Sequence, residues 1–144
     1  MYGLIEMKGV NLKPVLEMKT IITGIKKIRK GDAVGYNNTF VAKEDMTIAT
    51  IPVGYNEGVD RRLSNKGYMK VSGILCPIIG RVSMNITIID VSKINGVKIA
   101  DEVIVLSSNK QDKNSIENIT KDCETISYEI AVHIPPHLKR VMIK

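Results

Sequence analysis

The sequence predicts a mainly β protein, a β-barrel or β-sandwich domain with one or two short helices near the C-terminus. Two observations point to this class. Runs of apolar and β-branched residues recur along the chain and are separated by Gly, Asn, Asp and Pro, as in β-barrels and β-sandwiches. The aromatic fraction is only 4%, with no Trp and a single Phe. Isoleucine, valine, leucine and methionine must therefore fill the core, and abundant isoleucine favours strands.

The expected strands follow one another through most of the chain. Residues 15–25 are rich in β-branched side chains and predict one long strand, followed by a turn at Gly31–Asp32. Residues 47–53 predict another strand, with Pro52 at an edge or a strand end because proline has no N–H for a sheet ladder. Further strands are predicted over residues 68–71, 86–91 and 102–106, and a final, weakly alternating strand over residues 137–144.

The helical part is predicted between residues 115 and 134. Ser115 and Thr125 can each cap a helix N-terminus ahead of apolar residues at helical spacing, so two short helices are expected rather than one. The sequence shows no boundary between domains, and 144 residues suffice for one packed core. A single domain over residues 1–144 is therefore predicted.

Composition narrows the class of protein further. The chain has no apolar run of about eighteen residues and no secretion signal at its start, which predicts a cytoplasmic protein with no membrane partner. The net charge is +6. The densest basic run, residues 26–30, leads into a turn and has no interleaved aromatic residue for base stacking. It is predicted to be a solvated surface, with no nucleic-acid partner.

The cysteines and histidines predict neither a disulfide framework nor a metal site. Cys76 and Cys123 are few and widely spaced, so they are predicted to be buried, reduced thiols. His133 and His137 have the spacing of two ligands on a helix, but two prolines between them break the helix that would align them.

Short motifs follow one another in a definite order. The tetrapeptide Val-Gly-Tyr-Asn occurs at Val34–Asn37 and again at Val53–Asn56. Gly-Arg-Val-Ser-Met-Asn follows at Gly80–Asn85, and Thr-Ile-Ser-Tyr-Glu at Thr125–Glu129. In this order and at these intervals, the motifs resemble the C-terminal domain of the alanine racemase family, pyridoxal-phosphate-dependent isomerases that interconvert L- and D-alanine. The resemblance covers essentially the whole chain, beginning with Met1–Leu4, which looks like the exit from the family's barrel domain.

The resemblance implies that this chain supplies only part of an active site. In the family, the mainly β domain is a Greek-key-like β-barrel, which the resemblance therefore implies for this chain. That domain follows an N-terminal α/β barrel, and a lysine of the α/β barrel binds pyridoxal 5'-phosphate covalently. The chain alone is therefore expected to be inactive. The implied partners are a small amino-acid substrate, the N-terminal barrel domain and, in the full-length protein, a second subunit in a head-to-tail homodimer. D-alanine for bacterial cell wall precursors is the usual product.

Racemisation needs two acid/base groups on opposite faces of the substrate. By the resemblance, Tyr36 is the catalytic base that takes the α-proton from L-alanine, while the barrel lysine serves D-alanine. A free tyrosine has a pKa near 10, so a barrel histidine and arginine would have to lower it. Taken by itself, Gly35–Asn38 also suits an ordinary turn with a half-exposed tyrosine.

The resemblance assigns roles to several more residues. Tyr55 would line the narrow entrance and bind substrate, and Met84 would offer its backbone N–H to the substrate carboxylate. Arg61, Arg81 and Ile126 would belong to the entrance corridor, where positive charge draws a carboxylate inward. By pattern alone, the same residues also suit a turn tyrosine, a core methionine and solvated arginines.

Tyr128 resembles the tyrosine that donates a hydrogen bond to the cofactor phosphate, and its bulk favours alanine over serine as substrate. By pattern alone it is a helix tyrosine packed on the core. The chain departs from the family's usual sequence beside the site: Asn85 stands where Asp is common, and Asn56–Glu57 stand where Ala-Asp is usual. The family also often has small residues where Asn37 and Asn38 stand.

Two other functions remain open from the sequence. The same fold can act as a racemase of serine or of another amino acid. A non-catalytic basic β-barrel could instead bind RNA or an acidic protein. A binding module has no need of Tyr36, Tyr55, Met84 and Tyr128 in one register, and its basic residues should cluster beside aromatic residues, which they do not.

Overall fold

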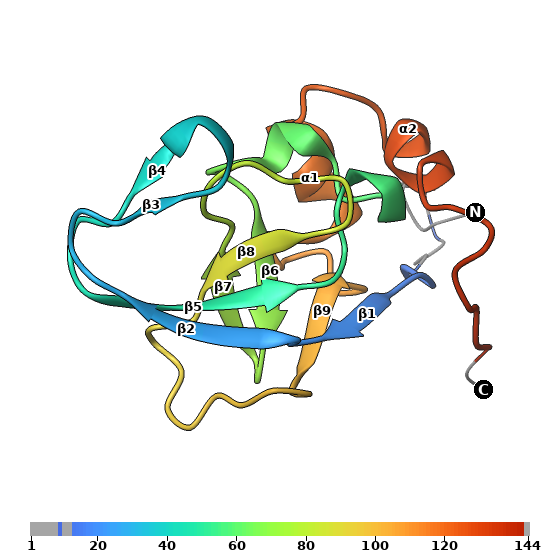
Figure 1. Ribbon diagram of the computed structural model, residues 1–144. Coiled ribbons are helices and arrows are strands. Elements are labelled where there is room, and N and C mark those ends of the chain that lie inside the picture. The colour runs from blue at the N-terminus through green and yellow to red at the C-terminus, as the bar shows by residue number, and fades with distance from the viewer. Residues whose placement is uncertain (1–8, 10–12, 143–144) are drawn as a thin grey trace.

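The computed structural model describes Gly9 and residues 13–142 and is mainly β, with two short helices near the C-terminus (Figure 1). The strands are β1 (Met18–Ile21), β2 (Gly24–Ile28), β3 (Ala33–Val34), β4 (Phe40–Val41), β5 (Met46–Ile51), β6 (Tyr68–Val71), β7 (Ile74–Pro77), β8 (Thr87–Asp90) and β9 (Glu102–Leu106). The helices are α1 (Ile116–Asp122) and α2 (Ser127–Val132), with single 3-10 turns η1 (Tyr36–Asn38), η2 (Tyr55–Glu57) and η3 (Arg61–Leu63). The predicted class is confirmed. The expectation for Met1–Leu4 lies outside the described residues.

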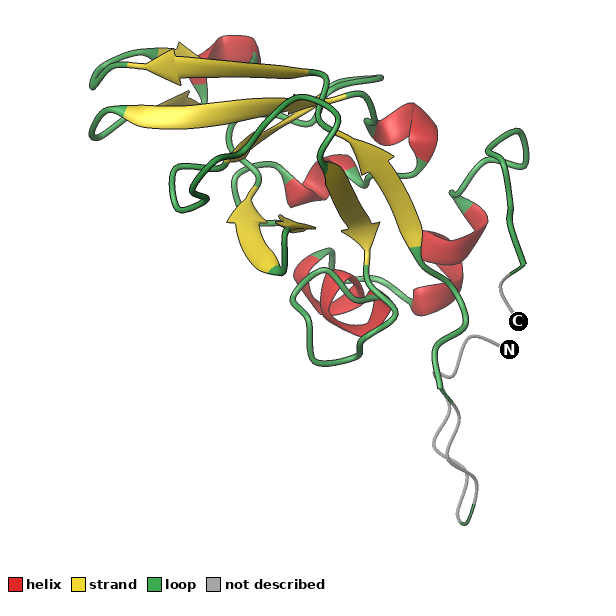
Figure 2. Ribbon diagram, turned by 90° about the horizontal axis from the view of Figure 1, so that it is seen from below, coloured by secondary structure: helices red, strands yellow, loops and turns green. Residues whose placement is uncertain are grey.

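The strands form three antiparallel sheets, with the orders β1-β9-β6-β7, β2-β5-β8 and β3-β4. These sheets do not close into the Greek-key-like β-barrel that the resemblance implied, and Figure 2 shows the strands as separate groups. Within the described residues, one isolated bridge, between Ile78 and Ile89, pairs the segment after β7 with β8. Closure needs a continuous ladder of hydrogen bonds around the ring, and here the ladder is interrupted between the sheets.

The predicted long strand over residues 15–25 is two strands separated by a corner at Ile22–Thr23. The backbone of Ile22 pairs with the segment before β9, where its N–H donates to the Asp101 carbonyl at 3.0 Å. The Thr23 N–H instead donates to the Thr50 carbonyl at the end of β5, also at 3.0 Å. The chain thus passes from one sheet to the other, as strands do at the corners of packed sheets.

The other strand predictions hold to different extents. The strands predicted over residues 68–71 and 102–106 have the bounds of β6 and β9, and residues 47–53 and 86–91 contain most of β5 and all of β8. The final strand predicted over residues 137–144 is wrong for its described part, because residues 137–142 pair with no strand in the described chain.

Strand β7 was not predicted, although the sequence contains a tight-turn signal directly before it. Ser72 and Gly73 both have positive φ, 49° and 80°, which is the conformation of the turn that best matches the twist of a hairpin. The hairpin pairs Val71 with Ile74 and Tyr68 with Pro77. The Ser-Gly pair between apolar runs was the available signal.

The two helices are confirmed, but only one of the two predicted caps is. The Ser115 hydroxyl accepts a hydrogen bond from the Asn118 N–H at 3.3 Å, as a helix N-cap does. Helix α2 begins after Ile126 without a side-chain cap. The Thr125 hydroxyl instead donates to the carboxylate of Glu129, so its prediction as a cap is wrong.

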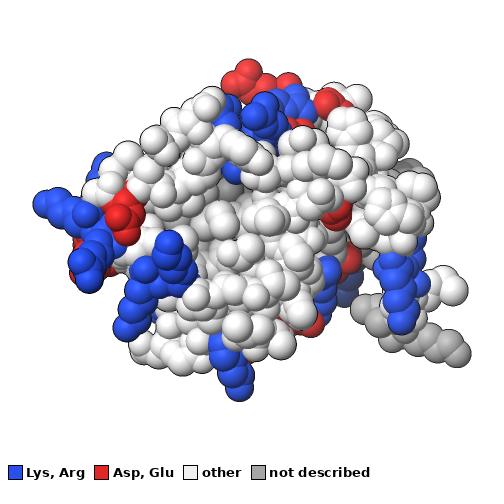
Figure 3. Space-filling view, viewed as in Figure 1, with Lys and Arg blue, Asp and Glu red and all other residues white. Residues whose placement is uncertain are grey.

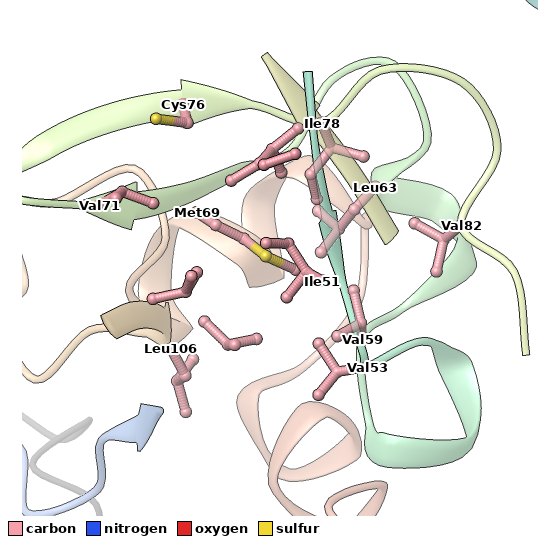
Figure 4. Close-up of a cluster of buried hydrophobic side chains, with 14 of the residues drawn as sticks. Ile51, Val53, Val59, Leu63, Met69, Val71, Cys76, Ile78, Val82 and Leu106 are labelled. Carbon is pink, nitrogen blue, oxygen red and sulfur yellow. The ribbon is translucent and has the colours of Figure 1, made fainter. Parts of the chain in front are cut away.

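The interior is filled by aliphatic side chains, as the low aromatic content required. In Figure 4, Leu63, Met69 and Ile78 point into one cluster with Ile51, and each is at most 4% exposed. The thiols of Cys76 and Cys123 are free and buried, as predicted, and burial raises the pKa of each to about 11.

The basic residues do not gather into one patch on the face seen in Figure 3, where lysine and arginine side chains stand around the rim and the middle is uncharged. Residues 26–30 run from β2 into the following turn, and all of them except the buried Ile28 are exposed. None of the helices within the described ranges is long and apolar enough to cross a membrane.

Candidate functional site

The loop Gly80–Ile86 receives the first Val-Gly-Tyr-Asn copy through a contact between two glycines. A Cβ atom added to Gly35 would lie 2.9 Å from the Arg81 nitrogen, and one added to Gly80 would lie 2.8 Å from the Val34 carbonyl oxygen. Both glycines have positive φ, 78° and 72°. Only residues without a side chain allow this approach. The contact holds Tyr36, the first residue of η1, beside Arg81.

The same loop receives the second copy at its other end. A Cβ atom on Gly54 would lie 2.1 Å from the Ser83 carbonyl oxygen. The Tyr55 N–H donates to that oxygen at 3.0 Å, and the Asn56 N–H donates to the Met84 carbonyl at 2.9 Å. The two repeated tetrapeptides thus dock on one short loop, and each presents its tyrosine at the start of a 3-10 turn.

The four residues with expected roles in substrate or cofactor contact lie on the surface. The exposed fractions of Tyr36, Tyr55, Met84 and Tyr128 are 65%, 48%, 53% and 60%. A core methionine at position 84 and a core-packed tyrosine at position 128 are therefore wrong. Met84 lies in the loop before β8, where the exposed turn rather than a strand decides its orientation.

The hydroxyls of Tyr36, Tyr55 and Tyr128 make no hydrogen bond to any other described residue. Tyr68 differs, because its hydroxyl accepts a hydrogen bond from the Lys113 ammonium at 3.3 Å. A phenol can both donate and accept hydrogen bonds. The three surface tyrosines therefore offer this capacity to groups outside the described chain.

Glu57 closes the η2 turn. Its carboxylate accepts hydrogen bonds from the Gly54 N–H at 2.8 Å and from the side-chain amides of Asn56 at 2.9 Å and Asn85 at 2.7 Å. Partial burial alone would raise the pKa of Glu57, but these hydrogen bonds hold it below its usual value. The ionised carboxylate thus joins both ends of the turn to the loop that carries Met84.

Arg62 ties helix α2 to the η3 turn. Its guanidinium donates to the Asp60 carboxylate at 2.6 Å, to the Glu129 carboxylate at 2.8 Å and to the Cys123 carbonyl at 3.0 Å. The hydrogen bond from Arg62 lowers the pKa of Asp60 despite its burial. The neighbouring residue in α2, Tyr128, is thereby held at a definite place relative to η3.

The three residues expected to form the entrance corridor lie in η3, in the Gly80–Ile86 loop and directly before helix α2. Arg61 opens η3, Arg81 lies in the Gly80–Ile86 loop, and Ile126 precedes α2 and is 64% exposed. Both arginines are exposed and form no ion pair with another described residue. Their charges are available to an anionic group outside the described chain.

Among the described residues, Asp60, Glu129 and His133 place their potential metal-ligand atoms within 4.8 Å of one another. The guanidinium of Arg62 is already bonded to both carboxylates, at 2.6 Å and 2.8 Å. A metal ion would have to displace that cation, so the cluster acts as a structural ion-pair network.

A family model described as alanine racemase, C-terminal domain, matches residues 15–142. The chain belongs to the alanine racemase family. It is 42% identical over 123 residues to the alanine racemase of Syntrophobacter fumaroxidans, covering 85% of this chain and 33% of that protein. It is 40% identical over 150 residues to the alanine racemase of Clostridium tetani, covering 100% of this chain and 39% of that protein.

Solved structures of alanine racemases share the fold. The crystal structure of the Bartonella henselae enzyme, with covalently bound pyridoxal phosphate, matches with a TM-score of 0.88 and 30% identity, over 99% of this chain and 39% of that one. The crystal structure of alanine racemase from E. faecalis matches with a TM-score of 0.82 and 28% identity, over 93% of this chain and 37% of that one. The chain thus spans between a third and two fifths of the length of these relatives.

Sequence reasoning missed two parts of this candidate site. It did not assign Arg62, although the Asp60-Arg61-Arg62 sequence places an acid two residues before an arginine. It treated Asn85 only as a departure from the Asp that is common in the family, whereas the structure bonds its amide to Glu57. Neither partner could be identified from local pattern, since Glu129 and Asn85 lie far along the chain from the residues they contact.

Replacing Arg62 with glutamine should destabilise the chain by about 1–2 kcal/mol at pH 7, because Asp60 and Glu129 lose a shared cation that is 42% exposed to screening solvent. The contribution of the Arg62–Asp60 pair to the free energy of unfolding depends on pH. Because folding lowers the pKa of Asp60 from 3.8, this stabilisation is fully present above about pH 4 and is lost as the pH falls through the lowered pKa. Urea unfolding of the unsubstituted chain and of Arg62→Gln, at pH 7 and at pH 3, measures the difference in their free energies of unfolding.

Arg61→Gln is the matched control, because Arg61 is exposed and unpaired within the described chain. It should leave the unfolding midpoint unchanged at both pH values. Equal destabilisation by the two substitutions would show that net charge, and not the Arg62 network, is responsible.

Proposed function

We propose that this chain is the C-terminal part of a pyridoxal-phosphate-dependent alanine racemase, with Tyr36 as one of its two catalytic acid/base groups. The observation that carries the proposal is the common anchorage of both tyrosine turns on the Gly80–Ile86 loop, with Tyr36 and Tyr55 exposed and their hydroxyls unpaired within the described chain. A surface tyrosine held by rigid glycine contacts, with no partner in its own domain, suits a site completed by another polypeptide.

The remaining groups fit distinct tasks in this reaction. The Met84 N–H donates to no carbonyl among the described residues, and it stands in an exposed turn where a substrate carboxylate can accept from it. Tyr55 narrows the approach to that N–H. Arg61 and Arg81, with Ile126, form the entrance corridor, and their positive charges favour an anionic carboxylate.

Tyr128 fits the cofactor better than the substrate, because a neutral phenol O–H donates to a phosphate oxygen and helix α2 holds it in place. When bound by the barrel domain, pyridoxal phosphate supplies the electron sink that makes an α-proton removable. Tyr36 then exchanges a proton between its hydroxyl oxygen and one face of the substrate carbon. The barrel lysine serves the opposite face.

The proposal includes a cytoplasmic, head-to-tail homodimer that supplies D-alanine for cell wall precursors. The exposed Tyr36, Tyr55 and Met84 form a surface that a partner subunit would cover. Tyr36, Tyr55 and Met84 would complete the partner subunit's site, while Tyr128 would serve the cofactor of its own subunit. Sedimentation of this chain joined to a barrel domain would test the dimer, and a monomer with full activity would contradict the shared site.

The function is tested by measuring racemisation of L-alanine with added pyridoxal phosphate. The assay compares this chain alone, the N-terminal barrel domain of the Clostridium tetani relative alone, and the two joined. We expect activity only in the joined protein, with alanine turned over faster than serine. A folded joined protein without activity on either amino acid would favour the binding-module function, and faster serine turnover would change the substrate.

A further inference from the structure

Glu57 and Asn85 join two segments that are otherwise held by only a few backbone hydrogen bonds. Oε1 of Glu57 accepts from the Asn85 amide at 2.7 Å and from the Asn56 amide at 2.9 Å, while Oε2 accepts from the Gly54 N–H at 2.8 Å. Beside this pair, the Tyr55 and Asn56 N–H groups donate to the carbonyls of the Ser83–Met84 segment at 3.0 Å and 2.9 Å.

The chemistry of the contact requires one carboxylate and one amide. All three groups bonded to Glu57 are neutral N–H donors, so an acceptor-only side chain satisfies every one of them. An aspartate at position 85 would place two carboxylates in contact, and a glutamine at position 57 would turn its NH₂ group either toward the asparagine amides or toward the Gly54 N–H, so that two donors face each other. Either change converts an attractive contact into a repulsive one.

We propose that Glu57 and Asn85 form a latch that positions the Tyr55 turn against the Met84 loop during turnover. The role in turnover rests on the proposed function. The latch fixes the Met84 N–H, which binds substrate there, relative to Tyr55, which lines its approach. Glu57 and Asn85 are positioning residues, because they act through Tyr55 and Met84 rather than on the substrate.

Three variants test the latch on the 144-residue chain itself. We expect Glu57→Gln and Asn85→Asp each to speed hydrogen exchange of the Tyr55 and Asn56 amides by about tenfold, the effect of losing one hydrogen bond to a charged group. The double variant restores one donor facing one carboxylate, and exchange should return toward the wild-type rate. Nuclear magnetic resonance measures these amides individually.

Two matched controls carry the same chemical changes elsewhere. Glu44→Gln and Asn95→Asp alter exposed side chains that contact neither segment, and they should leave the Tyr55 and Asn56 exchange rates unchanged. Wild-type exchange in both latch variants would overturn the proposal. Fast exchange in the double variant would also overturn the proposal. It would show that a donor facing a carboxylate at positions 57 and 85 is not what slows the exchange of these amides.

The same variants, joined to the Clostridium tetani barrel domain, test the positioning role. Each single substitution should raise KM for alanine more than it lowers kcat, and the double variant should recover KM. Faster exchange with unchanged KM would reduce the latch to a structural contact and overturn its role in turnover. If the unsubstituted joined protein is inactive, the proposed function fails, while the exchange rates still decide whether the latch exists.

Discussion

Replacing Tyr36 with phenylalanine in the joined protein should lower kcat/KM for alanine by about 10²–10⁴-fold, the usual contribution of a general acid/base group. The substitution removes only the hydroxyl, and the Gly35–Arg81 and Gly80–Val34 contacts that hold the turn stay in place. The loss should therefore appear without a change in the unfolding midpoint. Racemisation kinetics from both L- and D-alanine measure it.

The direction of proton removal gives a sharper signal than the rate. Because the two enantiomers are equally stable, kcat/KM must fall equally in both directions. Exchange of the α-proton with deuterated solvent need not be symmetric, and in Tyr36→Phe it should persist for D-alanine and stop for L-alanine. The control is Tyr68→Phe, whose hydroxyl pairs with Lys113 and which should leave racemisation unchanged. Full activity in Tyr36→Phe would remove this tyrosine from the mechanism.

Replacing Gly54 with alanine should destabilise the chain by about 3 kcal/mol, at the upper end of the cost of overpacking. The added Cβ would lie 2.1 Å from the Ser83 carbonyl oxygen and 2.5 Å from that of Met84. Both atoms belong to backbone, so relief requires the two segments to move apart. Urea unfolding measures the loss of stability, and amide chemical shifts of Tyr55 and Met84 report the separation.

Gly24→Ala is the matched control for this prediction. Its Cβ would meet only the Thr50 side chain, at 3.6 Å, which is an ordinary contact. The substitution within strand β2 should leave the stability unchanged or slightly raise it. If Gly54→Ala were as stable as Gly24→Ala and kept the wild-type shifts, the close docking of the Tyr55 turn on the loop would be incorrect.

Local pattern was sufficient where neighbours in the chain decide the structure. Strand β9 follows from its β-branched run, and strand β6 was predicted with its observed bounds. The two helices follow from apolar spacing and the Ser115 cap. The burial of Cys76 and Cys123 follows from the scarcity of cysteine in a globular chain. The order of the motifs was sufficient to indicate the racemase family, and the family model confirms that indication. The roles of the individual site residues stay predictions.

The sequence by itself determined the mainly β class, the aliphatic core and the family, because these depend on composition, short-range periodicity and motif order. Only the tertiary structure decided the corner at Ile22, the open sheets, the docking of both tetrapeptides on one loop, and the bonds that join Arg62 to Glu129 and Glu57 to Asn85. The physical reason is sequence separation: hydrogen bonds and steric contacts between distant segments leave no periodic signal in either segment.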